Sequence, residues 1–277
     1  MKKLISIVLT FSLLFVCALP AFAAQDALHY VVLGDSIAQG SGIYNREAAC
    51  YGKLVADTNG YTYANYGVNG LRSWDLIELL KRENVAADVA KADIVSLSIG
   101  GNDYLQQDLP KVITQTAQGN YKIINDIQDN YRGYFAEIVG MIRESNPDVT
   151  LLVQTLYNPQ YGALRDIYGM ATSRINEVIT DYLAANPGAF VLVDTVPVME
   201  GHPEYIAADT IHPSAVGNVE LARLILRHLK DLGLGDKTDP VTNKPGIDEV
   251  PFTSYVLKAI RDFFARIISL INSLFKR

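Results

Sequence analysis

Apolar and polar positions along the chain form two alternating kinds of segment. Short runs rich in β-branched and aromatic residues are bounded by Gly, Asn, Pro or Asp, which is typical of β-strands. Five such runs cover residues 29–33, 61–66, 93–99, 149–155 and 190–194. Their nearly continuous apolar character predicts strands that are buried on both faces of a sheet.

Between these runs, apolar residues recur at the three- and four-residue spacing of an amphipathic helix. The positions that mark the apolar faces are Trp74, Ile77 and Leu80; Ile138, Met141 and Ile142; Ile175, Val178 and Ile179; and Leu221, Leu224 and Ile225. Ser73 is the predicted N-cap of the first helix. Strands that alternate with helices predict an α/β fold, in which a five-stranded parallel sheet is covered by helices on both faces.

Ligands bind such a sheet at the carboxyl ends of its strands, and polar groups follow four of the predicted strands. In chain order, these groups are Gly34-Asp35-Ser36, Asn69-Gly70, Gly100-Gly101-Asn102-Asp103 and Asp209-Thr210-Ile211-His212. They contain a hydroxyl, an imidazole, a carboxylate and hydrogen-bond donors, which together can carry out acyl transfer. Asp35 is expected to have a structural role, because a carboxylate beside the nucleophile would oppose an oxyanion.

The chain has four histidines, at positions 29, 202, 212 and 228. His29 lies inside a predicted strand, and His228 lies near the end of the last predicted helix, where an imidazolium suits the helix dipole. Asp209 precedes His212 by about one turn, so its carboxylate can fix the imidazole tautomer. It can also stabilise the imidazolium that forms when Ser36 loses its proton. We therefore expect His212 to be the base.

Composition narrows the possible functions. The chain has 277 residues, of which 49% are hydrophobic and 19% charged, so it can form a substantial core. A net charge of −6 argues against a nucleic-acid partner, because such binding neutralises phosphates. Two cysteines cannot form a disulfide framework. The residues around Ser36 do not read G-x-S-x-G, and no nucleotide or zinc motif is present, so we expect no metal.

The first 23 residues predict a cleaved secretory signal peptide. Lys2 and Lys3 precede an apolar run, and Ala21-Phe22-Ala23 fits cleavage after Ala23. The mature protein is therefore expected to be secreted or associated with the cell surface. An uncleaved anchor is the alternative, although the apolar run is somewhat short for a membrane span.

The other end of the chain predicts a second appendage. Residues 232–251 are rich in Gly and Pro and are expected to form a linker. Residues 252–277 combine five basic side chains and one acidic side chain with apolar residues at helical spacing, which predicts a basic amphipathic helix. Three roles are open for this helix: docking on the acidic body, peripheral contact with an anionic membrane, or pairing with another helix.

The four strand-end groups, in this order, resemble the blocks of the GDSL/SGNH hydrolase family. The blocks are Gly34-Asp35-Ser36, the segment around Gly70, Gly100-Gly101-Asn102-Asp103 and Asp209-x-x-His212, and the resemblance spans residues 28–230. It implies a three-layer α/β/α sandwich of flavodoxin-like type in a domain of residues 24–231. It also implies ester hydrolysis without a metal or cofactor.

The resemblance also implies residue roles. Ser36 would be the nucleophile, His212 the general acid and base, and Asp209 its orienting partner. The backbone N–H groups of Ser36 and Gly70 and the side-chain amide of Asn102 would form the oxyanion hole.

The family contains lipase-like acylhydrolases and carbohydrate deacetylases, so lipid, small-molecule and carbohydrate esters are all candidate substrates. The spacing Gly-Gly-Asn-Asp-Tyr-Leu favours the acylhydrolases, and residues 104–134 are interpreted as part of a substrate-facing cover. A noncatalytic surface-binding protein with this fold is the alternative outside the enzymes.

Overall fold

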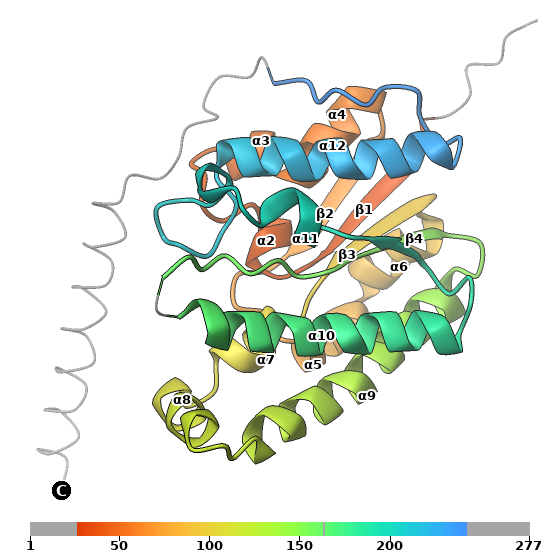
Figure 1. The fold of residues 1–277 in the computed structure, drawn as a ribbon. Coiled ribbons are helices and arrows are strands. Elements are labelled where there is room, and N and C mark those ends of the chain that lie inside the picture. Colours follow the sequence, from red (N-terminus) through yellow and green to blue (C-terminus); the bar gives the residue numbers. More distant parts are fainter. Residues whose placement is uncertain (1–26, 163, 243–277) are drawn as a thin grey trace, which may run out of the picture.

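A computed structural model of the chain describes residues 27–162 and 164–242 (Figure 1). Its five strands are β1 (His29–Gly34), β2 (Thr62–Gly67), β3 (Ile94–Ser98), β4 (Thr150–Gln154) and β5 (Val191–Val193). They form one parallel sheet in the order β2-β1-β3-β4-β5, which is the flavodoxin-like order. The sequence-based prediction of an α/β fold with a five-stranded parallel sheet is confirmed.

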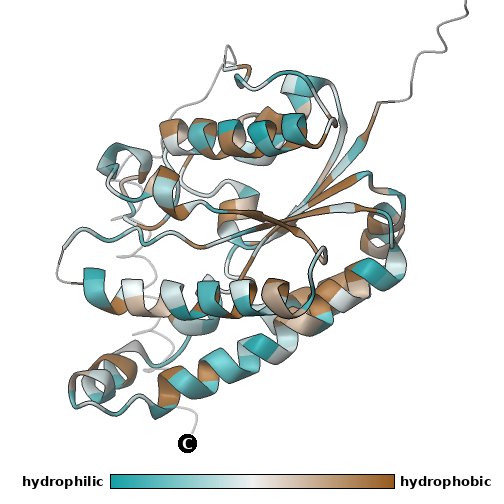
Figure 2. Cartoon of the chain, turned by 45° about the vertical axis from the view of Figure 1, so that its right-hand side comes forward, coloured by the Kyte–Doolittle hydropathy of each residue, from teal (hydrophilic) through white to brown (hydrophobic). Residues whose placement is uncertain are grey.

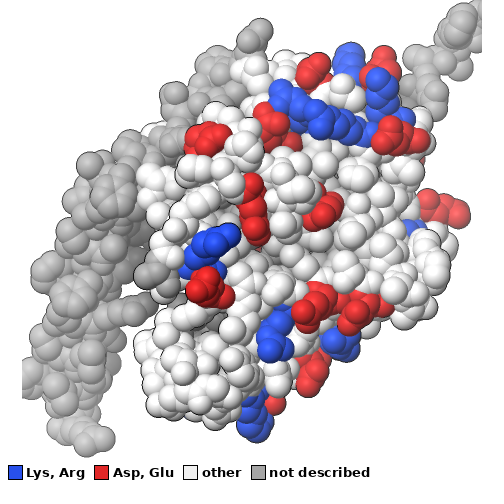
Figure 3. Space-filling model, viewed as in Figure 1, with Lys and Arg blue, Asp and Glu red and all other residues white. Residues whose placement is uncertain are grey.

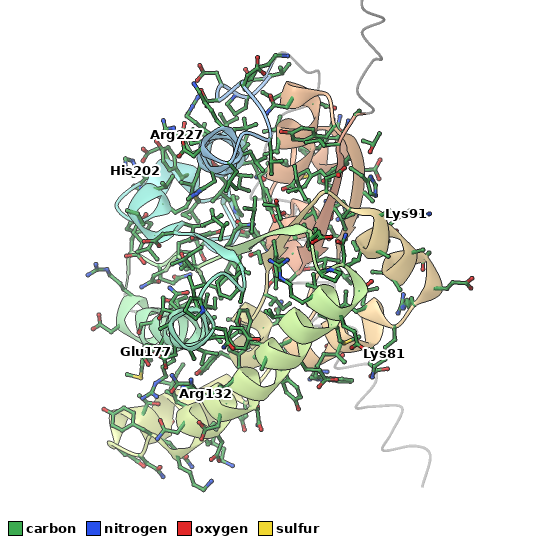
Figure 4. The ribbon with its side chains drawn as sticks, turned by 90° about the vertical axis from the view of Figure 1, so that its right-hand side faces the viewer. Lys81, Lys91, Arg132, Glu177, His202 and Arg227 are labelled. Atoms are coloured by element: carbon green, nitrogen blue, oxygen red, sulfur yellow. The ribbon has the colours of Figure 1, made fainter. Side chains whose placement is uncertain are left out.

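Helices cover both faces of this sheet, giving the three layers visible in Figure 1. One layer contains α5 (Ser73–Leu80), α6 (Glu83–Lys91), α9 (Lys122–Ser145) and α10 (Arg165–Ala185). The opposite layer contains α4 (Tyr51–Asn59) and α12 (Ala215–Asp231). Figure 4 shows the arrangement from the side, with Lys81 and Lys91 on one side of the molecule and His202 and Arg227 on the other.

Shorter helices lie in the connections between these elements. They are α2 (Ser36–Gln39), α3 (Arg46–Ala49), α7 (Gly101–Leu105), α8 (Leu109–Ala117), α11 (Val196–Met199) and the 3₁₀ turn η1 (Pro203–Tyr205). Three of them, α2, α7 and α8, follow the carboxyl ends of β1 and β3. They therefore lie at the edge of the sheet where a site is expected.

The core consists of two apolar clusters, one on each face of the sheet. Val31 and Leu33 of β1 belong to one cluster, whereas Tyr30 and Val32 belong to the other, because successive side chains of a strand point to opposite faces. Figure 2 shows the apolar colouring concentrated along the strands and the inward sides of the helices. The outer strands β2 and β5 are largely half-buried, since each has a neighbour on one side only.

The helix predicted to follow Ser73 includes Ser73 itself. Arg72 is the N-cap residue of α5, and its backbone N–H donates to the carboxylate of Asp75, at 3.2 Å. Ser73 is completely buried and bonds to Asp103 instead. Its prediction as an N-cap was wrong, because a carboxylate from a distant helix occupies the position that a local capping group would take.

The described part of the predicted linker, residues 232–242, lies against α4. Tyr61 Oη donates to the carbonyl of Leu234 at 2.6 Å, and the backbone N–H of Val241 donates to Thr58 Oγ1 at 3.0 Å. The predicted signal peptide, residues 1–23, and the predicted amphipathic helix, residues 252–277, lie outside the described residues. The remainder of the predicted linker, residues 243–251, lies outside them as well.

Charged side chains are distributed over the outer surfaces of the helices. On the face shown in Figure 3, Lys and Arg lie among Asp and Glu over α12, and the two signs also mix over α9 and α10. Among residues 27–162 and 164–242, no helix combines the length and apolarity needed to cross a bilayer.

Candidate active site

Ser36, Asp209 and His212 meet at the carboxyl edge of the sheet. Ser36 is the first residue of α2, two positions after β1, and it is only 7% exposed. Asp209 and His212 lie in the loop between η1 and α12. The structure thus brings together the hydroxyl, imidazole and carboxylate from positions up to 176 residues apart.

A continuous line of hydrogen bonds joins the three side chains. His212 Nε2 lies 2.8 Å from Ser36 Oγ, and His212 Nδ1 lies 2.5 Å from Asp209 Oδ2. Because an ionised carboxylate can only accept, Nδ1 carries a proton in this arrangement and Nε2 of the neutral ring is free to accept the serine proton. The geometry therefore suits general-base activation of the Ser36 hydroxyl.

The carboxylate of Asp209 is held in its ionised form by its partners. Burial opposes ionisation, but hydrogen bonds from the His212 ring and from the backbone N–H groups of Ile211 and His212 outweigh it, so the pKa of Asp209 is lowered. Those two N–H groups donate to Oδ1 at 3.0 Å each. They leave Oδ2 directed at the imidazole, which fixes the ring orientation.

The loop that carries Asp209 and His212 is anchored to the segment after β4. Tyr157 Oη donates to the carbonyl of Ile211 at 3.1 Å, and Gln160 Nε2 donates to the carbonyl of Thr210 at 2.6 Å. Thr210 has a φ of 64°, an uncommon conformation for a residue with a Cβ. These two anchors were not found from the sequence, because nothing in the local pattern around Tyr157 or Gln160 indicates which distant carbonyl they contact.

The three predicted oxyanion donors differ in how far their N–H groups are occupied. In the described part of the chain, the backbone N–H groups of Ser36 and Gly70 donate no hydrogen bond. The Asn102 amide donates once, to the carbonyl of Leu71 at 3.0 Å, and its second N–H is available. Ser36 and Asn102 line the same cavity as His212, whereas Gly70 does not line it, although its neighbour Asn69 does.

Helix α7 fixes the loop that carries Gly70. The side chain of Gln106 donates to the carbonyl of Gly70, and Asn102 holds the carbonyl of Leu71. The carboxylate of Asp103 accepts from the backbone N–H of Ser73 at 3.0 Å and from its hydroxyl. Asn102, Asp103 and the C-cap residue Gln106 therefore join the strand-end groups after β2 and β3 into one unit.

Asp35 lies directly beside the serine and is almost completely buried. Its Oδ1 accepts from the backbone N–H of Ile37 at 2.9 Å, which caps α2. Burial raises the pKa of Asp35 to about 6, although that hydrogen bond and the proximity of His212 oppose the rise. The structural role expected for Asp35 is consistent with this cap.

A cavity of about 200 Å³ opens beside Ser36 and His212. Its walls come from α2, α7, α8, α9 and α10 and from the segments after β2 and β4, and most of its lining side chains are apolar. Tyr104, Leu105, Val112 and Ile124 contribute to the walls. The segment 104–134, interpreted from the sequence as a substrate-facing cover, thus supplies part of the cavity.

Two of the other three histidines have side-chain partners outside this site, and the third is partly buried in α12. His29 Nδ1 lies 2.9 Å from Thr62 Oγ1, and His202 Nδ1 lies 2.9 Å from Glu204 Oε1. Burial lowers the pKa of His228, which disfavours the imidazolium expected from its position at a helix end. Within the described ranges, no group of three or more His, Cys, Asp or Glu side chains is arranged to hold a metal ion.

Comparison with known proteins matches this chain to one family. Residues 32–219 fit the model of the GDSL-like Lipase/Acylhydrolase family. The chain is 28% identical over 225 residues to the uncharacterized protein YpmR of Bacillus subtilis, covering 74% of this chain and 84% of that protein. It is 25% identical over 205 residues to the spore germination lipase LipC of Bacillus licheniformis, covering 69% and 91% respectively.

Solved structures share the fold at lower identity. The lipase Lip_vut3 from a goat rumen metagenome superimposes with a TM-score of 0.61 at 20% identity, covering 76% of this chain and 99% of that one. An acetyl-xylooligosaccharide esterase from Geobacillus stearothermophilus gives a TM-score of 0.54 at 23% identity, covering 74% and 94%. The α/β architecture is thus shared by proteins described as lipases and as a carbohydrate esterase.

The buried Asp35 carboxyl predicts a stability change with pH. Its pKa is about 6 in the folded protein against an ordinary 3.8, so the folded state binds more protons than the unfolded state between these values. Stability therefore falls as pH rises through that window, and above it the ionised group costs about 3 kcal/mol. Asp35→Asn keeps the capping oxygen and removes the ionisation. We expect the variant to unfold at higher denaturant concentration than the wild type at pH 7–8.

The control for this prediction is the same pair of proteins at low pH. At pH 3.5 and below, Asp35 is mostly protonated in both the folded and the unfolded state. The gain in free energy of unfolding from Asp35→Asn should therefore nearly disappear there. A gain of equal size from pH 3.5 to pH 8 would contradict the assignment of the effect to ionisation.

Proposed function

Because the chain belongs to the GDSL-like lipase/acylhydrolase family, we propose that it is a serine ester hydrolase that cleaves acyl esters of lipids or small molecules. The observation that carries this proposal is the unbroken hydrogen-bonded line from Asp209 through His212 to Ser36. The proposal needs no metal or cofactor, since each proton transfer has a donor and an acceptor among these side chains.

In the proposed reaction, Ser36 Oγ attacks the ester carbonyl carbon while His212 Nε2 takes the hydroxyl proton. The imidazolium that forms is stabilised by the ionised carboxylate of Asp209. The tetrahedral intermediate collapses as the C–O bond to the alcohol breaks, and His212 returns its proton to the departing oxygen. A water molecule then attacks the acyl-serine with His212 as base, which releases the carboxylic acid and restores Ser36.

Negative charge on the former carbonyl oxygen would be stabilised by the backbone N–H groups of Ser36 and Gly70 and by the Asn102 amide. These donors are fixed before the substrate arrives, because Gln106 and Asn102 hold the carbonyls of Gly70 and Leu71. Fixed donors avoid reorganisation during the reaction, which is why each can contribute a large share of the rate.

The carbohydrate O-deacetylase function is the second candidate within this family. The similarity to the fold of an acetyl-xylooligosaccharide esterase is the observation in its favour. The mainly apolar cavity beside Ser36 favours esters with acyl groups longer than acetyl. Release of acetate from acetylated xylan, without hydrolysis of esters with longer acyl groups, would support the deacetylase.

Ser36→Ala is expected to abolish ester hydrolysis while leaving the fold intact, because the methyl group removes only the nucleophile. The measurements are hydrolysis of p-nitrophenyl esters and the melting temperature. A fluorophosphonate should label the wild type at Ser36 and fail to label the variant. Turnover by the variant at the wild-type rate, or an unlabelled wild type, would contradict the proposal and favour a noncatalytic binding protein.

Asn102→Ala is expected to lower kcat by about 10²–10³-fold with a smaller effect on KM, because removing one oxyanion donor costs about 2.7–4 kcal/mol in the transition state. Asn130→Ala is a matched control at an exposed position of α9 and should retain wild-type kinetics. An unchanged kcat in the Asn102 variant would exclude its amide from the oxyanion hole.

We further propose that residues 1–23 direct export with cleavage after Ala23, and that residues 252–277 provide peripheral contact with an anionic membrane. The full-length mature protein should co-sediment with vesicles that contain anionic lipid more strongly than a form ending near Gly246. The difference should shrink as salt is raised, because basic side chains supply part of the attraction. Equal binding of both forms would exclude the membrane role of the tail.

A further inference from the structure

We propose that the cavity beside Ser36 is an acyl-chain pocket that selects esters with acyl groups of about six to eight carbons. This inference rests on the proposed function of Ser36 and deepens it by naming the substrate class.

The pocket runs away from the reacting groups. Ser36 and Ile37 of α2 line one part of it, and Val112 of α8 lines another. Figure 1 shows α2 and α8 well separated, with α7 and α10 between them. Because residues of α2, α7, α10 and α8 all line it, the cavity extends from Ser36 toward α8.

The lining becomes mainly apolar away from Ser36. Tyr104, Val112, Ile124 and Ile175 are each 5% exposed or less and come from four different helices. Most polar side chains of the lining lie at or beside the reacting residues, on Asp35, Ser36, Asn69, Asn102 and His212, and α10 adds Tyr168 and Thr172. A flexible hydrocarbon chain would fill such a cavity. A sugar bound there would leave several of its own hydroxyl groups without hydrogen-bond partners.

Three hydroxyl groups in the lining have acceptors within the protein, whereas the hydroxyl of Tyr168, which also lines the cavity, has none among the described residues. Tyr104 Oη donates to the carbonyl of Ile124 at 3.3 Å, and Tyr157 Oη donates to the carbonyl of Ile211 at 3.1 Å. Thr172 Oγ1 turns back to the carbonyl of Tyr168, at 3.0 Å. These side chains therefore present carbon atoms to the cavity.

The size of the cavity limits the chain it accepts. An engineered apolar cavity of about 150 Å³ takes up benzene, a ligand of six carbons. The cavity beside Ser36 measures about 200 Å³, so it suits a somewhat larger group. An acetyl group would leave most of it empty and gain little from burial, since the hydrophobic contribution grows with each methylene removed from water.

Two residues set the length in opposite directions. Ala171 of α10 is a small side chain in the wall, so a larger residue there would fill the cavity. Val112 of α8 is a branched, almost completely buried side chain in the same wall. Shortening Val112 should enlarge the apolar end of the cavity and admit longer chains.

The test compares p-nitrophenyl acetate, butyrate, octanoate and palmitate on the full-length mature protein. Each buried methylene favours binding about three- to fourfold, so wild-type kcat/KM for octanoate should exceed that for acetate by at least about 100-fold. Ala171→Leu should lower the octanoate value by about 10- to 50-fold and leave acetate within about twofold. Val112→Ala should raise the ratio of palmitate to octanoate.

Ala184→Leu, the same substitution at an exposed position of α10, is the matched control and should behave as wild type. A wild-type preference for acetate would overturn the acyl-chain pocket. Equal octanoate kinetics in the Ala171 and Ala184 variants would overturn it as well.

Binding without turnover separates this inference from the proposed function. Ser36→Ala protein should bind sodium octanoate but not sodium acetate by titration calorimetry, and Ala171→Leu in that background should weaken octanoate binding about tenfold. Absence of octanoate binding would overturn the pocket even if Ser36-dependent hydrolysis stands. Octanoate binding by a protein whose wild type hydrolyses no ester would retain the pocket and remove the proposed reaction.

Discussion

The hydrogen bond between Ser36 and His212 imposes the main constraint on this structure, because it joins the end of β1 to a loop near the end of the described chain. This hydrogen bond requires α12 to be held in a fixed position relative to the sheet. Asn218 of α12 accepts from the backbone N–H of Tyr51 at 3.0 Å, which fixes α12 against α4. The Ser214 side chain holds the start of α12 by bonding to Gly217 and to the carbonyl of Glu204. The reacting groups are therefore positioned by packing in the layer formed by α4 and α12.

The opposite layer positions the donors. The buried carboxylate of Asp103 ties α7 to the start of α5, and the neighbouring side chains of Asn102 and Gln106 hold the loop between β2 and α5. Burial raises the pKa of Asp103, and the two hydrogen bonds from Ser73 oppose that rise. The His212 imidazole and the proposed oxyanion donors Gly70 and Asn102 thus depend on different layers.

Much of this arrangement could be predicted from the sequence. Strand positions follow from short apolar runs, and the carboxyl-edge rule places Ser36, Asn102 and His212 together before any coordinates are known. What could not be predicted are the long-range side-chain partners. Serine is a residue type that favours helix N-caps, yet Ser73 binds Asp103, thirty positions away. The pattern likewise does not reveal that Gln160 anchors Thr210, because an isolated polar residue in a loop has many possible acceptors.

The segment after α12 has a practical consequence for fragment design. Although the family match ends at residue 219, the body continues: Gly235 lies so close to Tyr61 Oη that a Cβ would come within 2.5 Å of it, and Pro240 is buried. The backbone N–H of Val241 also donates a hydrogen bond to the Thr58 hydroxyl. A recombinant fragment cut directly after α12 would expose this seam on α4, so an expression boundary belongs beyond residue 242.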